Sequence, residues 1–167
     1  GDSSIYGALA WMSQDWNMRY PLIAWHGNNG SRDGDEPAAY RYTECKLSKL
    51  GEEMLADIKK NTVDWMNAYT DEEQEPIYLP GRIPNLIVNG TSGSAWAMAC
   101  SFAPHNLIEV MNAAVHVLEN PDCEVKSILD YITGPDFPTG GLVINKNELP
   151  TAYLTGKGRA RIRGEYV

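Results

Sequence analysis

The chain has 167 residues, 43% of them hydrophobic and 22% charged, and its formal net charge is −8 at pH 7. These values are typical of a globular chain with one or two domains, and the negative charge argues against a protein that holds nucleic acid by bulk attraction. No apolar run approaches a membrane span and no signal peptide is recognisable, so we expect no contact with a membrane. The three cysteines are far apart and include no C-x-x-C pair, so we expect a protein of the reducing cytoplasm. Because the sequence opens with Gly1-Asp2 rather than methionine, we also expect a fragment of a longer protein.

The first predicted element is a helix over residues 1–16. Its apolar residues recur at helical spacing and form one stripe, Ile5, Ala8, Leu9, Met12 and Trp16. Asp2 or Ser3 is the expected N-cap, and Ser3 and Ser4 offer N–H and O–H groups to a phosphate. The opposite face is small and uncharged, with Ser3, Gly7, Ala10 and Gln14. It is either a sparsely decorated surface or a face built for close approach to DNA or a partner protein.

The next segments alternate between strand and loop patterns. Residues 21–25 are predicted to form a strand, and residues 26–39 a glycine-rich loop. Residues 40–44, YRYTE, alternate like a strand, which would place Tyr40 and Tyr42 on one face and Arg41 on the other. Residues 46–60 are predicted to form a helix with Leu47, Leu50, Met54 and Ile58 on one face. Helix, strand, long loop and strand is the outline of a helix-turn-helix with a wing.

Prolines at 76, 80 and 84 indicate a domain boundary near residue 79. Beyond it we predict a strand over 85–90, a loop of small residues over 91–106, helices over 107–120 and 124–132, and a rigid connector over 134–141. In the tail, Arg159, Arg161 and Arg163 alternate with apolar residues, which predicts a strand with one basic face. That strand is either an edge kept from aggregating by its charge or a stripe that follows phosphates.

Few residues have the spacing of a metal site. Asp33 and Asp35 could bind Mg²⁺, but a glycine-rich loop favours a role for them in turns. The three histidines share no ligand spacing, and the three cysteines include no C-x-x-C pair. We therefore predict neither a metal site nor a disulfide scaffold in this chain.

The Arg41-Tyr42 pair has two interpretations. A free phenol has a pKa near ~10, so a nucleophilic tyrosine needs a nearby cation or metal. A cation also stabilises the negative charge of a phosphoryl-transfer transition state. From these residues alone, a packed tyrosine is favoured over a nucleophile.

Longer motifs change that balance. The segments GDSSIY, MSQDW, HGNNGSRDGD, AAYRYTE, IPNLIVNGTSG, PHNLIEVMNAAV, GPDFPTGG and TGKGRARIRGE follow one another in this order along the chain. Together they resemble the breakage-reunion part of the A subunit of bacterial type IIA DNA topoisomerases, which are DNA gyrase and topoisomerase IV. The resemblance covers essentially the whole chain.

The resemblance implies an α+β fold, with a winged-helix domain at 1–79 followed by part of an α/β tower domain at 80–167. It implies that Tyr42 attacks a DNA phosphodiester to form a 5′-phosphotyrosyl link, assisted by Arg41. The first helix would be the recognition helix of the DNA gate. The expected DNA-binding residues are Ser3, Ser4, Arg32, Lys46, Ser94, Arg159 and Arg161. Mg²⁺ and ATP would be bound by the partner B subunit, and the A subunits would form a homodimer on double-stranded DNA.

Two positions depart from the family pattern. In the family a serine and an acid four residues later bind quinolones through a water–metal bridge; Ser3 matches the serine, but Gly7 replaces the acid. An isoleucine that unstacks DNA bases corresponds to Ser94, which offers little apolar surface. The first hypothesis is thus a topoisomerase fragment, inactive in strand passage by itself. The alternative is a non-catalytic DNA-binding or dimerisation module with the same fold.

Overall fold

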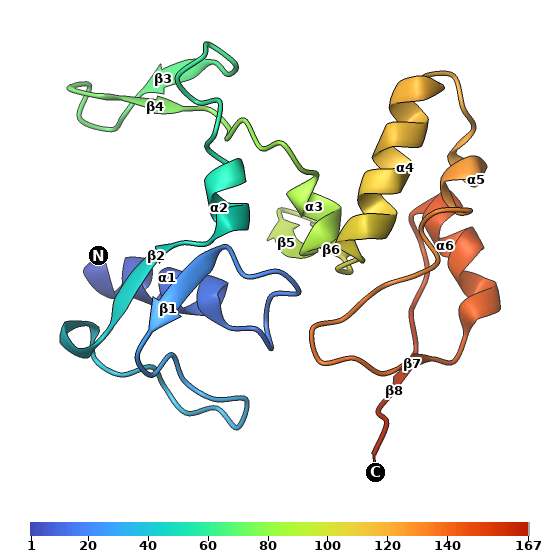
Figure 1. Cartoon of the computed structure of the whole chain (residues 1–167), viewed down its shortest axis with the longest axis horizontal. Coiled ribbons are helices and arrows are strands. Elements are labelled where there is room, and N and C mark those ends of the chain that lie inside the picture. The colour runs from blue at the N-terminus through green and yellow to red at the C-terminus, as the bar shows by residue number, and fades with distance from the viewer. Residues whose placement is uncertain (167) are drawn as a thin grey trace. The chain divides into compact units, whose positions relative to one another are not determined.

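The computed structural model describes residues 1–166, which form two compact units, Gly1–Pro84 and the remainder of the chain from Asn85 (Figure 1). Each unit combines short helices with two-stranded antiparallel sheets, so the fold class is α+β, as predicted. Within residues 1–166 no helix is both long enough and apolar enough to cross a membrane.

The first unit is built around one helix and one pair of strands. Its elements are α1 (Asp2–Ser13), β1 (Ile23–His26), the 3-10 turn η1 (Tyr40–Tyr42), β2 (Glu44–Leu47), α2 (Lys49–Glu53), β3 (Trp65–Asn67) and β4 (Gln74–Pro76). β1 and β2 pair antiparallel, with Ile23 opposite Leu47 at one end and His26 opposite Glu44 at the other. The core of the unit is formed by Ala10, Met18, Ile23 and Val63. The pairing leaves residues 27–43 as a long connection at the His26 end of the sheet.

Helix α1 is rotated relative to the prediction. Its N-cap is Gly1, without a side-chain cap, and the helix ends at Ser13 rather than near residue 16. Ala10 and Gln14 are buried, whereas Ile5 is 66% exposed. The reason is that the loop after β1 lies on the small, polar side of the helix, where the Gln14 amide donates to the Asn29 carbonyl at 2.7 Å. Half of the face expected to be free for a partner is therefore covered by the chain itself.

Two further predictions in this unit were wrong. Residues 40–42 form a 3-10 turn, and the strand starts only at Glu44. The helix predicted over 46–60 is reduced to α2, because Leu47 belongs to β2 and Ser48 caps the helix by accepting from the Gly51 amide. Gly51 is buried, and a Cβ there would lie 2.3 Å from the Leu22 carbonyl oxygen, so a side chain at this position would clash.

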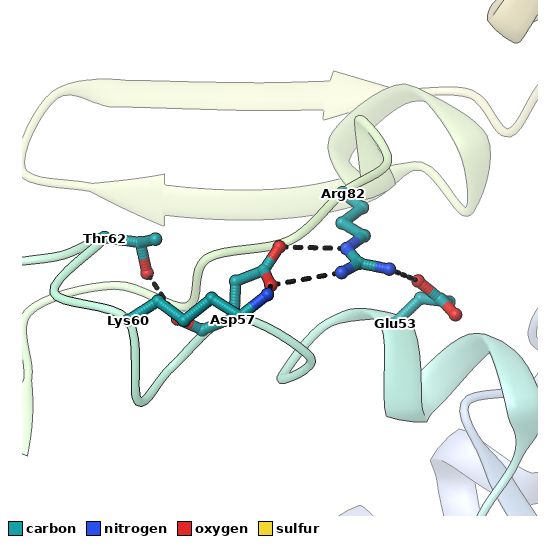
Figure 2. Close-up of polar contacts among 5 residues, drawn as sticks. All are labelled: Glu53, Asp57, Lys60, Thr62 and Arg82. Carbon is teal, nitrogen blue, oxygen red and sulfur yellow. Dashed lines mark hydrogen bonds and ion pairs between the residues drawn. The ribbon is translucent and has the colours of Figure 1, made fainter.

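An ion-pair network fixes the turns that follow α2 (Figure 2). The Arg82 guanidinium donates two hydrogen bonds to Asp57, at 2.9 and 3.1 Å, and one to Glu53 at 3.0 Å. Lys60 adds an ion pair to the same Asp57 carboxylate at 2.9 Å. Arg82, and then Lys60, hold the pKa of Asp57 well below its usual range. The network links the end of the first unit back to α2, although its exposed position makes it a weak source of stability.

The second unit has more helix. Its elements are α3 (Asn85–Val88), β5 (Thr91–Ala95), β6 (Met98–Phe102), α4 (Leu107–Glu119), α5 (Val125–Ile128), β7 (Leu142–Val143), η2 (Lys146–Glu148), α6 (Leu149–Thr155) and β8 (Ile162–Arg163). Val88, Val110, Ala113 and Leu149 form its core. The buried His105 joins two helices, because its Nδ1 contacts the Ile87 carbonyl at 2.9 Å and its Nε2 the Tyr153 hydroxyl at 2.7 Å.

The helix predicted over 107–120 is confirmed as α4, and Asn106 caps it by accepting from the amides of Ile108 and Glu109. The strand predicted over 85–90 is wrong, because residues 85–88 are helical. The loop predicted over 91–106 contains the β5–β6 hairpin, which is exposed throughout and therefore lacks a hydrophobic alternation. The helix predicted over 124–132 shortens to α5, and the basic strand of the tail shortens to β8.

Candidate active site

Arg41 and Tyr42 lie together in η1, between the loop and β2. The guanidinium carbon of Arg41 is 4.7 Å from the centroid of the Tyr42 ring, within the range of a cation–π contact. A strand would have placed these side chains on opposite faces, and the 3-10 turn is what brings them to the same side. The Tyr42 side chain is 68% exposed, so its phenol is open to a macromolecular substrate with a permanent cation beside it.

The backbone of η1 is held by the end of the sheet. Tyr42 N–H donates to the Ala39 carbonyl at 2.9 Å and Thr43 N–H to the Tyr40 carbonyl at 3.3 Å, which closes the turn. Gly27 follows β1 with φ +111°, and a Cβ at that position would lie 3.1 Å from both the Tyr42 carbonyl oxygen and the Thr43 methyl group. A glycine is required there by both its conformation and the close approach of the Tyr42 backbone.

The loop that delivers Tyr42 is internally hydrogen-bonded. Ala38 N–H donates to the Asn28 carbonyl at 3.0 Å, and Ser31 N–H donates to the Asp35 carbonyl at 3.2 Å. The Asp35 carboxylate accepts from the Ser31 hydroxyl at 2.5 Å, and the Asp33 amide donates to that hydroxyl at 3.2 Å. The two aspartates therefore act in a turn, as predicted. Across residues 1–166, three or more His, Cys, Asp or Glu side chains do not gather into a group that could hold a metal ion.

The start of α1 borders the same loop. Asp2, Ser3, Tyr6 and Gly7 line one side of an open hollow of about 640 Å³, and residues 36–40 line the other. Ser3, Ser4 and Gly7 are exposed, and a Cβ added at Gly7 would meet no atom within 4 Å. The exposed first turn of α1 and the segment that leads into Tyr42 thus form one surface.

The other predicted DNA-binding residues are spread over both units. Arg32 and Lys46 are exposed in the first unit, on the loop and on β2. Ser94, Arg159 and Arg161 are exposed in the second unit. Ser94 lies on β5 opposite Ala99, and Asn145 anchors the backbone of the two arginines at 2.7 and 2.8 Å. None of these five residues contributes to the contact between Arg41 and Tyr42.

Three residues at these surfaces were missed by sequence reasoning. Trp96, at the tip of the β5–β6 hairpin, is 99% exposed, and Met98 beside it is 68% exposed. A lone indole in a run of small residues was the available signal. Tyr6 lies off the predicted apolar stripe of α1, and its hydroxyl contacts Ala38 and Thr43, on either side of η1. Nothing in the pattern of the sequence pointed to this contact.

Comparison with known proteins gives one consistent result. The family model for the A subunit of DNA gyrase/topoisomerase IV matches residues 1–167. The DNA gyrase A subunit of Haloquadratum walsbyi is 48% identical over 166 residues, which cover 99% of this chain and 19% of that protein. The DNA gyrase A subunit of Campylobacter jejuni is also 48% identical, over 99% of this chain and 19% of its own length. The DNA topoisomerase 4 A subunit of Streptococcus pyogenes serotype M3 is 49% identical over 163 residues, covering 98% of this chain and 20% of its own length. The chain thus spans about a fifth of the length of the curated relatives it matches.

Proposed function

The chain belongs to the family of DNA gyrase and topoisomerase IV A subunits, and we propose that it is the part of such a subunit that cuts and reseals double-stranded DNA. In this proposal the enzyme is a topoisomerase, an isomerase that changes DNA topology. Residues 1–79 would form its winged-helix domain and residues 80–167 part of its tower domain, whereas the two compact units divide after Pro84. The observation that carries the proposal is the exposed Tyr42 phenol with the Arg41 guanidinium 4.7 Å from its ring.

The proposed reaction is a transesterification at phosphorus. The Tyr42 oxygen forms a bond to the phosphorus of a DNA phosphodiester, and the bond from phosphorus to the 3′ oxygen breaks. The phenol loses its proton and the departing 3′ oxygen gains one, so one phosphodiester replaces another without an oxidant or reductant. Arg41 would stabilise the negative charge that builds on the phosphoryl oxygens, as a preorganised cation does in phosphoryl transfer. Resealing is the same step in reverse.

In this proposal, Mg²⁺ and ATP are bound by the partner B subunit. The Asp35 carboxylate accepts from Ser31 in its turn, and the acidic, histidine and cysteine side chains of residues 1–166 form no group of three or more that could hold a metal ion. The resemblance to topoisomerase A subunits is the ground for assigning both cofactors to the B subunit. Two A subunits would form a homodimer across one DNA duplex in the cytoplasm. The isolated 167-residue chain would lack strand passage.

DNA would be held by surfaces of both units. In the first unit, the exposed start of α1, with Ser3 and Ser4, lies beside the segment that leads to Tyr42, and Arg32 and Lys46 add positive charge. In the second unit, Arg159 and Arg161 would contact phosphates. Ser94 lies near the tip of the β5–β6 hairpin, where Trp96 offers the large apolar surface that serine lacks. An exposed apolar side chain of this size can wedge between bases and kink a duplex.

The test is a covalent trapping experiment. The full-length A subunit that carries this region is mixed with a cognate B subunit, Mg²⁺ and end-labelled duplex DNA, and then denatured. We expect protein attached to 5′ ends in the wild type and none in Tyr42→Phe, with DNA binding retained. Absence of the adduct from both proteins, with binding intact, would replace this proposal with a non-catalytic DNA-binding module.

A further inference from the structure

We propose that Tyr6 is a positioning residue for Tyr42, and that its hydroxyl holds the η1 turn in the geometry from which Tyr42 attacks DNA. The inference rests on the proposed function, because it concerns the same transesterification. It assigns a role in that step to Tyr6, which lies on a different element, α1. The nearer in sequence of the two residues that its hydroxyl contacts is Ala38, 32 residues away.

The Tyr6 hydroxyl contacts the chain just before and just after η1. It donates to the Ala38 carbonyl at 2.5 Å, and it lies 2.8 Å from the Thr43 hydroxyl. A phenol has one proton, and Tyr6 gives it to Ala38, so the second contact uses the Thr43 proton, for which the Tyr40 carbonyl, 3.3 Å from the Thr43 hydroxyl, is a second acceptor. Ala38 and Thr43 flank the segment 39–42, so one oxygen atom fixes the separation between the two ends of the segment that carries the nucleophile.

Tyr6 is itself held in place by aromatic packing. Its ring centroid lies 5.6 Å from that of Trp25 on β1 and 6.3 Å from that of Tyr40, the first residue of η1. The Tyr40 contact has an interplanar angle of 73°, an edge-to-face arrangement that aromatic pairs prefer. The Tyr6 ring is thus packed against β1 and η1, and its hydroxyl connects α1 to both ends of the segment 39–42.

The Tyr42 side chain depends on this support. It is 68% exposed, and the one ring contact described for it is to Arg41, its neighbour in the same turn. The direction of the phenol is thus set by the backbone of residues 39–43 and not by a packed pocket. A misplacement of a reacting group by about 1 Å can cost ~10²-fold in rate. Loss of the Tyr6 hydroxyl is expected to slow cleavage by roughly 10- to 100-fold for this reason.

Tyr6→Phe in the full-length A subunit, tested with its B subunit and Mg²⁺, is the first experiment, because it removes the hydroxyl and keeps the ring. We expect single-turnover cleavage and resealing to slow by a similar factor, since both pass through the same transition state. DNA affinity and the ratio of cut to uncut DNA at equilibrium are expected to stay near wild-type values. Tyr69→Phe is the matched control, because the Tyr69 side chain is fully exposed on the same unit.

The outcomes separate the two proposals. If the wild type forms no Tyr42-dependent adduct, the proposed function fails. If the wild type forms the adduct and Tyr6→Phe cuts saturating DNA at the wild-type rate, only the role of Tyr6 is overturned. Should Tyr6→Phe lose its cooperative thermal unfolding, Thr43→Val decides by the same criteria, because it keeps a similar shape and removes both contacts of the Thr43 hydroxyl, to Tyr6 at 2.8 Å and to the Tyr40 carbonyl at 3.3 Å.

Discussion

The guanidinium of Arg41 lies over the ring of Tyr42, 4.7 Å from its centroid, although the two residues are neighbours in the chain. This arrangement exists because residues 40–42 form a turn rather than a strand. It places an exposed phenol and a cation together on one surface. The proposed chemistry depends on that pairing, and its parts can be tested separately.

Arg41→Ala is expected to lower the single-turnover rate of DNA cleavage by about 10²–10³-fold, the usual cost of removing one preorganised donor from a transition state. Arg41→Lys keeps the charge but loses the planar fork, so it should recover only part of that rate. Filter binding is expected to show similar DNA affinity for all three proteins. Wild-type cleavage by Arg41→Ala would show that the cation is structural.

Gly7→Asp is expected to increase quinolone-stabilised cleavage, measured as linear DNA formed by the complete enzyme at increasing drug concentration. The reason is that Gly7 occupies the place of the family's acid, four residues after Ser3, and has open space around it. Gly7→Ala is the matched control, since it adds a methyl group without a carboxylate. It should stabilise the exposed helix by about 0.5–1 kcal/mol and leave drug sensitivity unchanged. If Gly7→Asp and Gly7→Ala respond equally to the drug, position 7 does not take part in quinolone binding.

Trp96→Ala is expected to reduce DNA bending, measured by energy transfer between dyes at the two ends of a short duplex. The side chain is 99% exposed, and an inserted apolar group stabilises an unstacked base step. The matched control is Ser92→Ala on the same hairpin, which removes a hydroxyl and no apolar surface. Bending at the wild-type level in Trp96→Ala would rule out the indole as the wedge.

Tyr153→Phe tests the core of the second unit. The substitution removes the hydroxyl that lies 2.7 Å from the His105 Nε2, and His105 is only 5% exposed. We expect the free energy of unfolding, measured in urea, to fall by about 1–3 kcal/mol. Burial, and then the charge of Glu109, raise the pKa of Tyr153 to about 12. The fold therefore favours the neutral Tyr153 phenol. The stability that this phenol adds to the folded state is fully present below pH ~10 and is lost as the pH rises to about 12. The stability difference between wild type and variant should shrink over that interval, and a constant difference would contradict the assignment.

The α+β class was predicted from the resemblance to topoisomerase A subunits. The loop before Tyr42 and helix α4 were predicted from the residues themselves, because glycine-rich turns and a strong helical period are local signals. It did not indicate η1, since Tyr40, Arg41 and Tyr42 alternate as a strand would. Gly27 and Tyr6 lie against the residues of the turn and its flanks but are distant from them in sequence. The β5–β6 hairpin was missed because exposed strands of small residues carry no hydrophobic alternation.

The roles of Tyr42 and Arg41 came from the resemblance to topoisomerase A subunits and not from periodicity. Residue chemistry alone favoured a packed tyrosine, whereas the structure places the Tyr42 side chain in solvent. Likewise, Ala10 and Gln14 were expected on an open face of α1 and are buried. Their burial depends on where the loop after β1 packs against α1, and the apolar spacing within one helix carries no information about that loop.

The central claim is that Tyr42 itself becomes linked to DNA, and mass spectrometry of the trapped complex tests it most directly. The complete enzyme is trapped on duplex DNA, digested with nuclease to leave a residual nucleotide, and then cut with trypsin after Arg and Lys. Cleavage after Arg32, Arg41 and Lys46 separates Tyr42, in the peptide 42–46, from Tyr40, in the peptide 33–41. We predict the nucleotide mass on Tyr42. A nucleotide on Tyr40, or on no tyrosine of this chain, would contradict the account.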